Sequence, residues 1–460
     1  MGYFTYSDFK GKSSLLPAGL LMFTLAVSSC SSEYKKHAGD EGKQVASILR
    51  GNGCLECHAA DAKLPFYGKF PVIGPTVEAD MREGTLYLDL TSLVDALENG
   101  KPVSEVDLAK VEHTALSGSM PPFKYSAIHW GTSLNSEERG ILISWAKNVR
   151  KNNFAISTVA ETFANEPVQP LMESLPADPD KVALGFALYH DTRLSADNTL
   201  SCASCHGLET GGVDRKQYSE GINGQLGGVN APTVYNAALN FVQFWDGRAA
   251  DLKEQAAGPP LNPVEMGHTS FDDICASISE DKEFMKAFLQ VFPEGISEST
   301  ITEAIAEFEK TLLTPSRFDK YLMGDTQALT KEELEGYELF KENRCATCHV
   351  GVNFGGQSFE YTGIKNNYFD YRGTGLTDGD LGRYAVTADD SDLHKFKTPG
   401  LRNVMLTYPY MHDGTIEHIE DAIRIMHEFQ IGKNISDAET AKIVAFLHTL
   451  TGEYNGQILH

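Results

Sequence analysis

The sequence lacks a hydrophobic run long enough to cross a membrane as a helix. The apolar stretch near its N-terminus runs from Leu15 to Val27 and contains Pro17. At about 13 residues it is shorter than the roughly 20 that a transmembrane helix needs. Lys10 and Lys12 precede it, and a short apolar segment after basic residues is typical of an export signal.

Positive charge is also scarce. The 460 residues include 39 Lys and Arg against 63 Asp and Glu, so the formal net charge is −24. This excess excludes nucleic acid as a partner, because its phosphates would be repelled, and leaves a basic or neutral partner open. No strand-rich region stands out, and 42% hydrophobic residues indicate a globular chain with a core. The expected fold class is mostly α.

The apolar stretch ends in Val27-Ser28-Ser29-Cys30, which resembles a bacterial lipobox. In signals of that kind the cysteine becomes the lipidated first residue of the mature protein, so residues 1–29 are predicted to be a lipoprotein signal peptide. The alternative is an ordinary signal peptide with a chance cysteine at position 30. Acyl chains on Cys30 would tether a soluble body to a membrane surface.

Six of the eight cysteines fall into three identical patterns, each followed at once by histidine. The three are Cys54-Leu55-Glu56-Cys57-His58, Cys202-Ala203-Ser204-Cys205-His206 and Cys345-Ala346-Thr347-Cys348-His349. In this pattern two thiols bond covalently to one porphyrin, and the adjacent imidazole binds its iron. Zinc ligation would need a second half-site nearby, and a thioredoxin-like pair would leave the histidines unexplained. We therefore predict three covalently bound haem c groups. Such attachment takes place outside the cytoplasm, in agreement with the export signal.

The three patterns begin more than 140 residues apart, so each is assigned to its own helical domain with long haem-wrapping loops. The predicted N-terminal haem-binding domain covers 38–150, and a proline-marked linker covers 151–179. The domain of the second haem covers 180–324 and that of the third covers 325–460. Helices are expected at 136–147, 271–288, 301–313, 331–341, 416–429 and 437–450. Cys275 falls in the second of these and is predicted to be a buried free thiol.

Residues from about 184 to 452 resemble the bacterial di-haem cytochrome c peroxidases and their relatives, the methylamine-utilisation di-haem oxidases. Apart from the two haem patterns, the resemblance depends on six segments. They are Leu188 to Ser195, Asn230 to Thr233, Phe244 to Arg248, Asn262 to Met266, Thr398 to Asn403 and Tyr408 to Gly414. The N-terminal part resembles a smaller haem-binding domain fused to such peroxidases, through the Cys54 pattern, Leu64 to Tyr67 and Ser119 to Pro122. Together the parts look like a tri-haem peroxidase.

The resemblance implies that the His206 haem is the site of peroxide reduction. Glu265 and Gln255 would line its distal side, with Glu265 moving a proton between the two peroxide oxygens. Without the resemblance, Glu265 would be interpreted as a first-turn helix carboxylate. Trp245 would lie between the second and third haems and help electrons to pass, although a large buried core residue is the simpler interpretation.

The resemblance also assigns axial ligands to the other two haems. Met426 matches the methionine that completes the electron-transfer haem at His349, where the oxidase subgroup has a tyrosine. Met426 also fits a helical apolar stripe with Ile416, Ile419 and Ile423, and Met405 and Met411 are alternatives. For the haem at His58 the expected ligand is Met120, because a methionine before Pro121-Pro122 occupies a stiff, exposed turn. His113 and His129 are alternatives there.

Two further expectations come from the resemblance. Asn230, Thr407 and Pro409 match a calcium site at the domain interface, built from hard oxygen ligands. Many family members block the peroxide haem with a loop histidine, and Ile222 occupies that position here. No histidine occurs between His206 and His268, so the His206 haem is predicted to need no reductive activation, with Tyr218 or water at its sixth position.

The sequence thus predicts a lipid-anchored tri-haem peroxidase in the periplasm or on the outer surface. Electrons would pass from quinol or a small c-type cytochrome to the His58 haem, then to the His349 haem and the His206 haem. A homodimer is expected from the resemblance. The alternatives are a di-haem-type oxidase acting on a protein or organic substrate, which Met426 argues against, and a pure electron carrier, which needs no Glu265.

Overall fold

The computed structural model describes residues 33–71, 73–126 and 132–460, so the predicted signal peptide, Cys30 and His129 lie outside it. Helices dominate, and two small antiparallel sheets, β1–β2 and β3–β4, are the sheets of the described chain. No helix in these ranges is long and apolar enough to span a membrane. The dominance of helices and the small size of the two sheets confirm the expected mostly α class.

The N-terminal part is a helical bundle around one apolar core. Its elements are η1 (Glu33–His37), α2 (Glu41–Gly51), η2 (Cys54–Glu56), η3 (Phe66–Lys69), α3 (Gly74–Tyr87), α4 (Leu90–Glu98), α5 (Glu105–Ser117), α6 (Phe123–Ser126) and α7 (Ser136–Asn153). Asn135 and Glu138 form a capping box that starts α7, so this helix begins at the predicted residue. The helix continues beyond 147 to Asn153, because Arg150 in its last turn is fully buried and paired with Glu112.

The middle part contains η4 (Glu161–Phe163), α8 (Pro179–Tyr189), η5 (Thr192–Leu194), α9 (Cys202–Cys205), η6 (Leu208–Thr210), η7 (Ile222–Gly224), η8 (Ala237–Leu239), α10 (Leu252–Leu261), α11 (Phe271–Ser279), α12 (Lys282–Val291) and α13 (Glu298–Glu309). The single helix expected at 271–288 is two helices, because Asp281 caps the start of α12 and ends the run. Cys275 is free but half-buried rather than buried. Gly185 lets α8 approach α13 closely, since a Cβ there would lie 1.9 Å from the Ala304 carbonyl oxygen.

The C-terminal part contains α14 (Arg317–Leu322), α15 (Lys331–Glu342), η9 (Cys345–Thr347), β1 (Phe359–Tyr361), α16 (Tyr368–Arg372), η10 (Asp378–Leu381), α17 (Tyr384–Thr387), η11 (Asp390–Asp392), β2 (Lys395–Lys397), η12 (Val404–Leu406), α18 (Ile419–Ile425), the π-helix η13 (Met426–Ile431), α19 (Asp437–His448), β3 (Glu453–Tyr454) and β4 (Gln457–Ile458). Strand β1 pairs with β2 in the register Phe359 to Lys397. Helix α15 packs on α19 through Gly336, whose Cβ would lie 2.0 Å from the Lys442 carbonyl oxygen.

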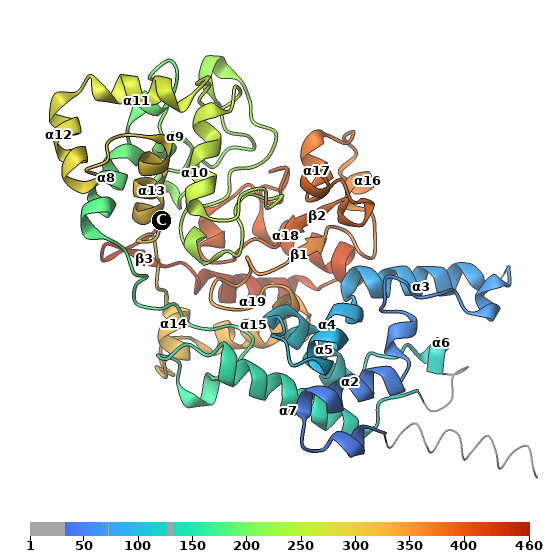
Figure 1. The fold of residues 1–460 in the computed structure, drawn as a ribbon. Helices are drawn as coiled ribbons and strands as arrows, with labels where there is room; N and C mark the ends of the chain where they lie inside the picture. The colour runs from blue at the N-terminus through green and yellow to red at the C-terminus, as the bar shows by residue number, and fades with distance from the viewer. Residues whose placement is uncertain (1–32, 72, 127–131) are drawn as a thin grey trace, which may run out of the picture.

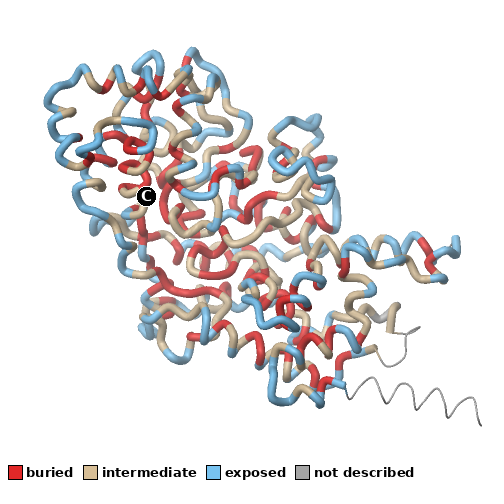
Figure 2. The backbone as a smooth tube through the Cα atoms, in the orientation of Figure 1, coloured by how far each residue is buried: buried red, intermediate tan, exposed pale blue. Residues whose placement is uncertain are grey.

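The C-terminal part lies between the other two, with the N-terminal part at lower right and the middle part at upper left (Figure 1). Buried residues form a core within each part (Figure 2). The segment between α7 and α8 is bound to the C-terminal part by a buried hydrogen bond. The Leu171 amide donates to buried Asp319, and Asp319 forms an ion pair with Arg402 in which both side chains are 1% exposed. The predicted linker is therefore fastened to the C-terminal part.

Candidate active site and haem-binding pockets

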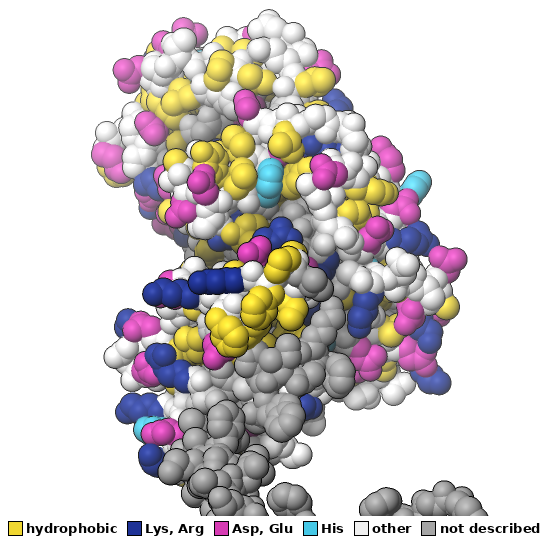
Figure 3. Space-filling view, turned by 90° about the vertical axis from the view of Figure 1, so that its right-hand side faces the viewer, with side chains coloured by type: hydrophobic (Ala, Val, Ile, Leu, Met, Phe, Trp, Pro, Cys, Tyr) yellow, Lys and Arg dark blue, Asp and Glu magenta, His cyan; other side chains and the backbone are white. Residues whose placement is uncertain are grey.

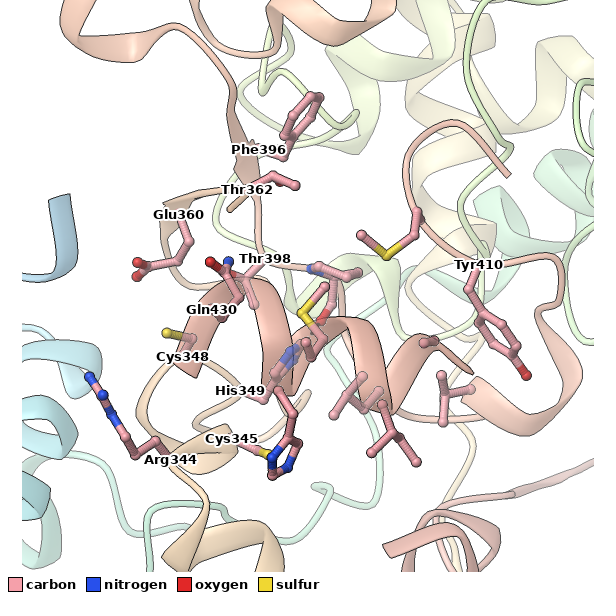
Figure 4. Close-up of a pocket in the computed structure, with 18 of the residues that line it drawn as sticks. Arg344, Cys345, Cys348, His349, Glu360, Thr362, Phe396, Thr398, Tyr410 and Gln430 are labelled. Carbon is pink, nitrogen blue, oxygen red and sulfur yellow. Dashed lines mark hydrogen bonds between the residues drawn. The ribbon is translucent and has the colours of Figure 1, made fainter. Parts of the chain in front are cut away.

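The third cysteine pattern lies in an apolar cavity of about 240 Å³. Cys345, Cys348 and His349 line it, and Figure 4 shows His349 between Cys348 on one side and Tyr410 on the other. The His349 Nδ1 lies 3.1 Å from the Phe354 carbonyl oxygen and 3.2 Å from that of Pro399. A proton on Nδ1 donated to these carbonyls leaves Nε2 free as a metal ligand. Free thiols, an oriented imidazole and an apolar cradle together fit a covalently held haem.

Met426 and Met411 both line this cavity, whereas Met405 packs in the apolar core beside it. The expected helix 416–429 is divided, since α18 starts at Ile419 and becomes a π-helix at Met426. His427 also lines the cavity, and its buried Nε2 has no hydrogen-bond partner in the described chain. The sequence reasoning overlooked His427, although a buried histidine next to a candidate ligand was a usable signal.

Trp245 lines the same cavity from the middle part of the chain. Its indole Nε1 donates to the Asn230 carbonyl oxygen at 2.9 Å, and its ring lies edge-on to Phe396 and His412, with centroid separations of 6.4 Å to each. Phe396 in turn stacks on His412 at 4.2 Å. Three neighbouring aromatic rings thus line the cavity, and the one from the middle part, Trp245, is oriented by its hydrogen bond.

The second cysteine pattern forms α9 and the residue after it. Tyr189 donates a hydrogen bond of 2.5 Å to the His206 carbonyl oxygen and so fixes the backbone there. Burial lowers the pKa of His206, although the backbone of Gly212 and Pro232 acts in the opposite direction. Its Nδ1 is buried without a hydrogen bond of normal geometry. The free thiols of Cys202 and Cys205 and the half-buried imidazole of His206 provide the donor set that a haem requires.

Glu265 lies in the turn after α10, on the same side as the second pattern. Burial raises its pKa, opposed by Arg248 and by Asn262, whose side chain donates to Glu265 Oε1 at 2.8 Å. Its charge also contributes to the raised pKa of the Cys205 thiol, behind burial and Asp214, so the two groups are neighbours. Gln255 is half-buried on α10. The sequence reasoning did not single out Asn262 or Arg248, although both fall within the motifs it used.

Ile222 is buried beside Glu265. Its amide donates to the Glu265 carbonyl oxygen at 2.8 Å, and its side chain fills the space next to Gly267. The preceding loop passes the second pattern, since Ser219 interacts with the Cys205 thiol. Tyr218 in that loop is half-buried. An apolar side chain therefore occupies the position where a loop histidine would be needed.

The first cysteine pattern includes η2. His58 Nδ1 lies 2.9 Å from the Leu88 carbonyl oxygen, and burial lowers the pKa of His58, opposed by the backbone of Leu88 and of Gly84. Met120 is half-buried after α5. The segment that follows Met120 lies beside the first cysteine pattern, as shown by the hydrogen bond of 2.6 Å that the Tyr125 hydroxyl donates to Glu56. Burial, together with Arg344 and Lys433, lowers the pKa of His113 to about 4, so His113 faces the C-terminal part.

The residues expected to bind calcium lie at the junction of the middle and C-terminal parts. The Asn230 side chain donates to the Lys216 carbonyl oxygen at 2.9 Å, and Thr407 and Pro409 follow η12. Their carbonyl and amide oxygens are calcium-type donors. Nearby, Asp380, His412 and Asp413 place one ligand atom each within 4.8 Å of one another. Arg372 already forms ion pairs with both carboxylates, which satisfies their charge without a metal.

Comparisons with known proteins match all three parts of the chain. Residues 179–327 match the family model "Di-haem cytochrome c peroxidase", residues 23–148 a "Haem-binding domain" and residues 334–451 "Cytochrome c". Cytochrome c peroxidase Ccp of Escherichia coli is 46% identical over 93% of this chain and 91% of its own length. Cytochrome c551 peroxidase of Nitrosomonas europaea is 45% identical over 63% of this chain and 85% of its own.

Among solved structures, a MauG-like protein associated with microbial copper homeostasis is similar with a TM-score of 0.55 and 30% identity. The match covers 62% of this chain and 95% of the other. This structural match covers less than two thirds of the chain, whereas the longest of the sequence matches covers nearly all of it.

Proposed function

This chain belongs to the di-haem cytochrome c peroxidase family, and on that premise we propose that it is a tri-haem enzyme that reduces hydrogen peroxide. The reaction takes two electrons and two protons and forms two water molecules. Electrons enter at the His58 site, pass to the His349 site and continue past Trp245 to the His206 site. When bound, the haems supply electron storage and the iron that cleaves the peroxide bond.

The observation that carries this proposal is the half-buried Glu265 beside the second cysteine pattern. Its carboxylate is oriented by Asn262 at 2.8 Å, and burial raises its pKa. A raised pKa brings a carboxylate nearer to the pH at which it can both accept and release a proton. Glu265 would take a proton from one peroxide oxygen and deliver it to the other, with half-buried Gln255 on the same side as a hydrogen-bonding group.

The first test replaces this carboxylate. We expect Glu265→Gln to lower peroxide turnover by about 10²–10⁴-fold, because general acid–base catalysis contributes that much. The exposed Glu280→Gln is the matched control and should keep the parental rate. In the parent, turnover should fall as the pH drops through the raised pKa, since the accepting carboxylate is then lost. Steady-state turnover with a reduced artificial donor measures all three, and an active Glu265→Gln enzyme would contradict the proposal.

The remaining ligands follow from the same proposal. Cys54, Cys57, Cys202, Cys205, Cys345 and Cys348 attach the three haems, and His58, His206 and His349 bind the irons. Met120 and Met426 would complete the first and third sites and so close them to peroxide. The support for Met426 is its place in the lining of the His349 cavity.

We expect Met426→Ala to abolish the methionine-to-iron charge-transfer absorption of the third haem and to lower its reduction potential, because methionine ligation raises potentials. Met411→Ala, which removes another methionine from the same cavity, should leave both unchanged. A spectrum typical of two histidine ligands in the parent would instead assign the position to His427. Redox titration followed by visible absorption distinguishes these outcomes.

The setting of the enzyme is proposed from the sequence. The export signal and the haem attachment place it in the periplasm or on the outer surface, held to the membrane through Cys30. Quinol or a small c-type cytochrome would supply electrons, calcium would bind at Asn230, Thr407 and Pro409, and the enzyme would act as a homodimer. Acidic and basic side chains are intermingled over the face shown in Figure 3, so that face carries no large patch of one charge.

The alternative is an oxidase of the methylamine-utilisation type that acts on a protein or organic substrate. The buried Ile222 favours it, because an apolar residue at this position cannot serve as a histidine ligand at the His206 site. Met426 argues against it, because that subgroup has a tyrosine there. Absence of peroxide turnover in protein that carries all three haems would favour this oxidase, or a pure electron carrier.

A further inference from the structure

The cavity around His349 receives one aromatic side chain from each neighbouring part of the chain. Trp245 reaches it from the middle part, and Tyr87, the last residue of α3, reaches it from the N-terminal part. Trp245 already has a proposed role in electron transfer from the His349 site to the His206 site. The sequence reasoning gave Tyr87 no role, although it occupies the corresponding place between the His58 site and the His349 site.

Tyr87 is connected directly to the first haem site. The next residue, Leu88, provides the carbonyl oxygen that lies 2.9 Å from His58 Nδ1. One turn earlier Gly84 lies against the His58 ring, since a Cβ there would be 3.4 Å from its Nε2. The end of α3 therefore holds the His58 imidazole and, one residue away, inserts an aromatic ring into the His349 cavity.

The ring of Tyr87 is held between two cations. Lys110 Nζ lies 5.1 Å and Arg344 Cζ 4.4 Å from the ring centroid. Lys110 forms an ion pair with Glu360 of β1 at 2.8 Å, with the two side chains 5% and 11% exposed. Glu83 of α3 also pairs with Lys365. The contact between the parts is thus fixed by charges at the point where Tyr87 crosses it.

The hydroxyl group of Tyr87 does not explain this placement. It is buried and has no hydrogen-bond partner in the described chain. A leucine would fill such a space without leaving a polar atom unpaired. A half-buried tyrosine whose hydroxyl is buried without a partner, in a cavity lined by Cys348 and His349, indicates that the ring serves the group held there.

We propose that Tyr87 is the bridge through which electrons pass from the His58 site to the His349 site. The inference rests on the proposed function and names the residue that joins its first two haems. With haems bound, one electron would pass from the group held by His58 to the group held by His349, so that the first is oxidised and the second reduced by one electron. Tyr87 breaks no bond and moves no proton. Two cations over its ring oppose the loss of an electron from it, so Tyr87 conducts without being oxidised.

The test measures electron transfer inside the full-length protein, without peroxide. A flash-photoreduced flavin delivers less than one electron per molecule, and absorption then follows equilibration between the first and third haems. We expect Tyr87→Leu and Tyr87→Met to slow this equilibration about tenfold or more, and Tyr87→Phe to stay near the parental rate. The exposed Tyr371→Leu is the matched control and should also equilibrate at the parental rate.

Spectra and potentials of the three haems should be unchanged in every variant, because Tyr87 is not an iron ligand. Parental rates in both the Leu and Met variants would overturn the proposal, and so would a Phe variant as slow as the Leu variant. The measurement needs no peroxide turnover. Failure of the peroxidase assignment would therefore appear in the parent's turnover and not in these rates.

Discussion

Position 222 illustrates how one side chain can set the resting state of an enzyme. Ile222 is buried and hydrogen-bonded through its backbone to the residue that would move protons, Glu265. Isoleucine cannot bind iron, so the His206 haem should react with peroxide without prior reduction. A histidine has the chemistry to bind iron, and the family resemblance assigns the loop histidine of other members to this position.

We predict that the fully oxidised parent shows no low-spin bis-histidine signal from the second haem. Ile222→His should create that signal and make peroxide turnover depend on prior reduction. Electron paramagnetic resonance of the oxidised proteins gives the first result, and turnover with and without pre-reduction gives the second. A bis-histidine signal already present in the parent would contradict the prediction.

At the residue scale the sequence identified the chemistry through spacing alone. Cysteines two apart with an adjacent histidine can be recognised without knowing the fold, and the structure places the third such set in an apolar cavity. Asn262 was overlooked although its partner Glu265 is only three residues away, whereas Arg248 and Tyr87 were not found because the residues that they contact are distant in the sequence. Nothing in the local pattern of a residue reports such contacts.

At the scale of elements, helix starts were predicted better than helix ends. Thr330 with Glu333 and Ser436 with Glu439 form capping boxes, which are local, so α15 and α19 begin as expected. The apolar stripe at 416–429 predicted one continuous helix and missed the π-helix at Met426. Such a change in winding depends on packing around the cavity, and hydrophobic periodicity does not encode it.

Helix α5 carries a titratable side chain, Glu105, at its contact with the C-terminal part. Burial raises the pKa of Glu105 to about 7, opposed by Arg150, and the carboxylate lies against Gly351 of the C-terminal part. The native state therefore binds a proton more tightly than the unfolded state does. Its contribution to stability is complete below the unfolded pKa and is lost as the pH rises through about 7.

We predict that Glu105→Gln raises the free energy of unfolding at roughly pH 8 by about 1–3 kcal/mol and flattens its dependence on pH between roughly 5 and 8. The exposed Glu342→Gln should behave as the parent. Denaturant unfolding at several pH values measures both. An unchanged slope in Glu105→Gln would show that another group titrates.

At the scale of the whole molecule, the parts are joined by buried charges as well as by apolar contact. Val106, Ala109 and Val350 form a small apolar cluster between α5 and the C-terminal part, and the Lys110–Glu360 ion pair lies close by. No sequence pattern predicts a pair 250 residues apart. The division into three haem-binding parts could be expected from the spacing of the cysteines, but their docking could not.

We predict that Lys110→Met destabilises the docked state by about 3–5 kcal/mol, because Glu360 is left as an unpaired buried charge. The N-terminal part should then unfold in a separate, earlier calorimetric transition. The double variant Lys110→Met/Glu360→Gln should recover much of the loss. If the double variant is as unstable as the single one, the loss comes from packing rather than from charge.

The cavity at His349 takes its walls from Tyr87, Trp245 and the C-terminal part itself. It is therefore completed by residues that leave the ribosome long before its own cysteines do. If Cys345 and Cys348 receive their porphyrin while those walls are still apart, attachment at the last motif would precede the final docking of the N-terminal and middle parts. A chain that docked first would then exclude its own cofactor.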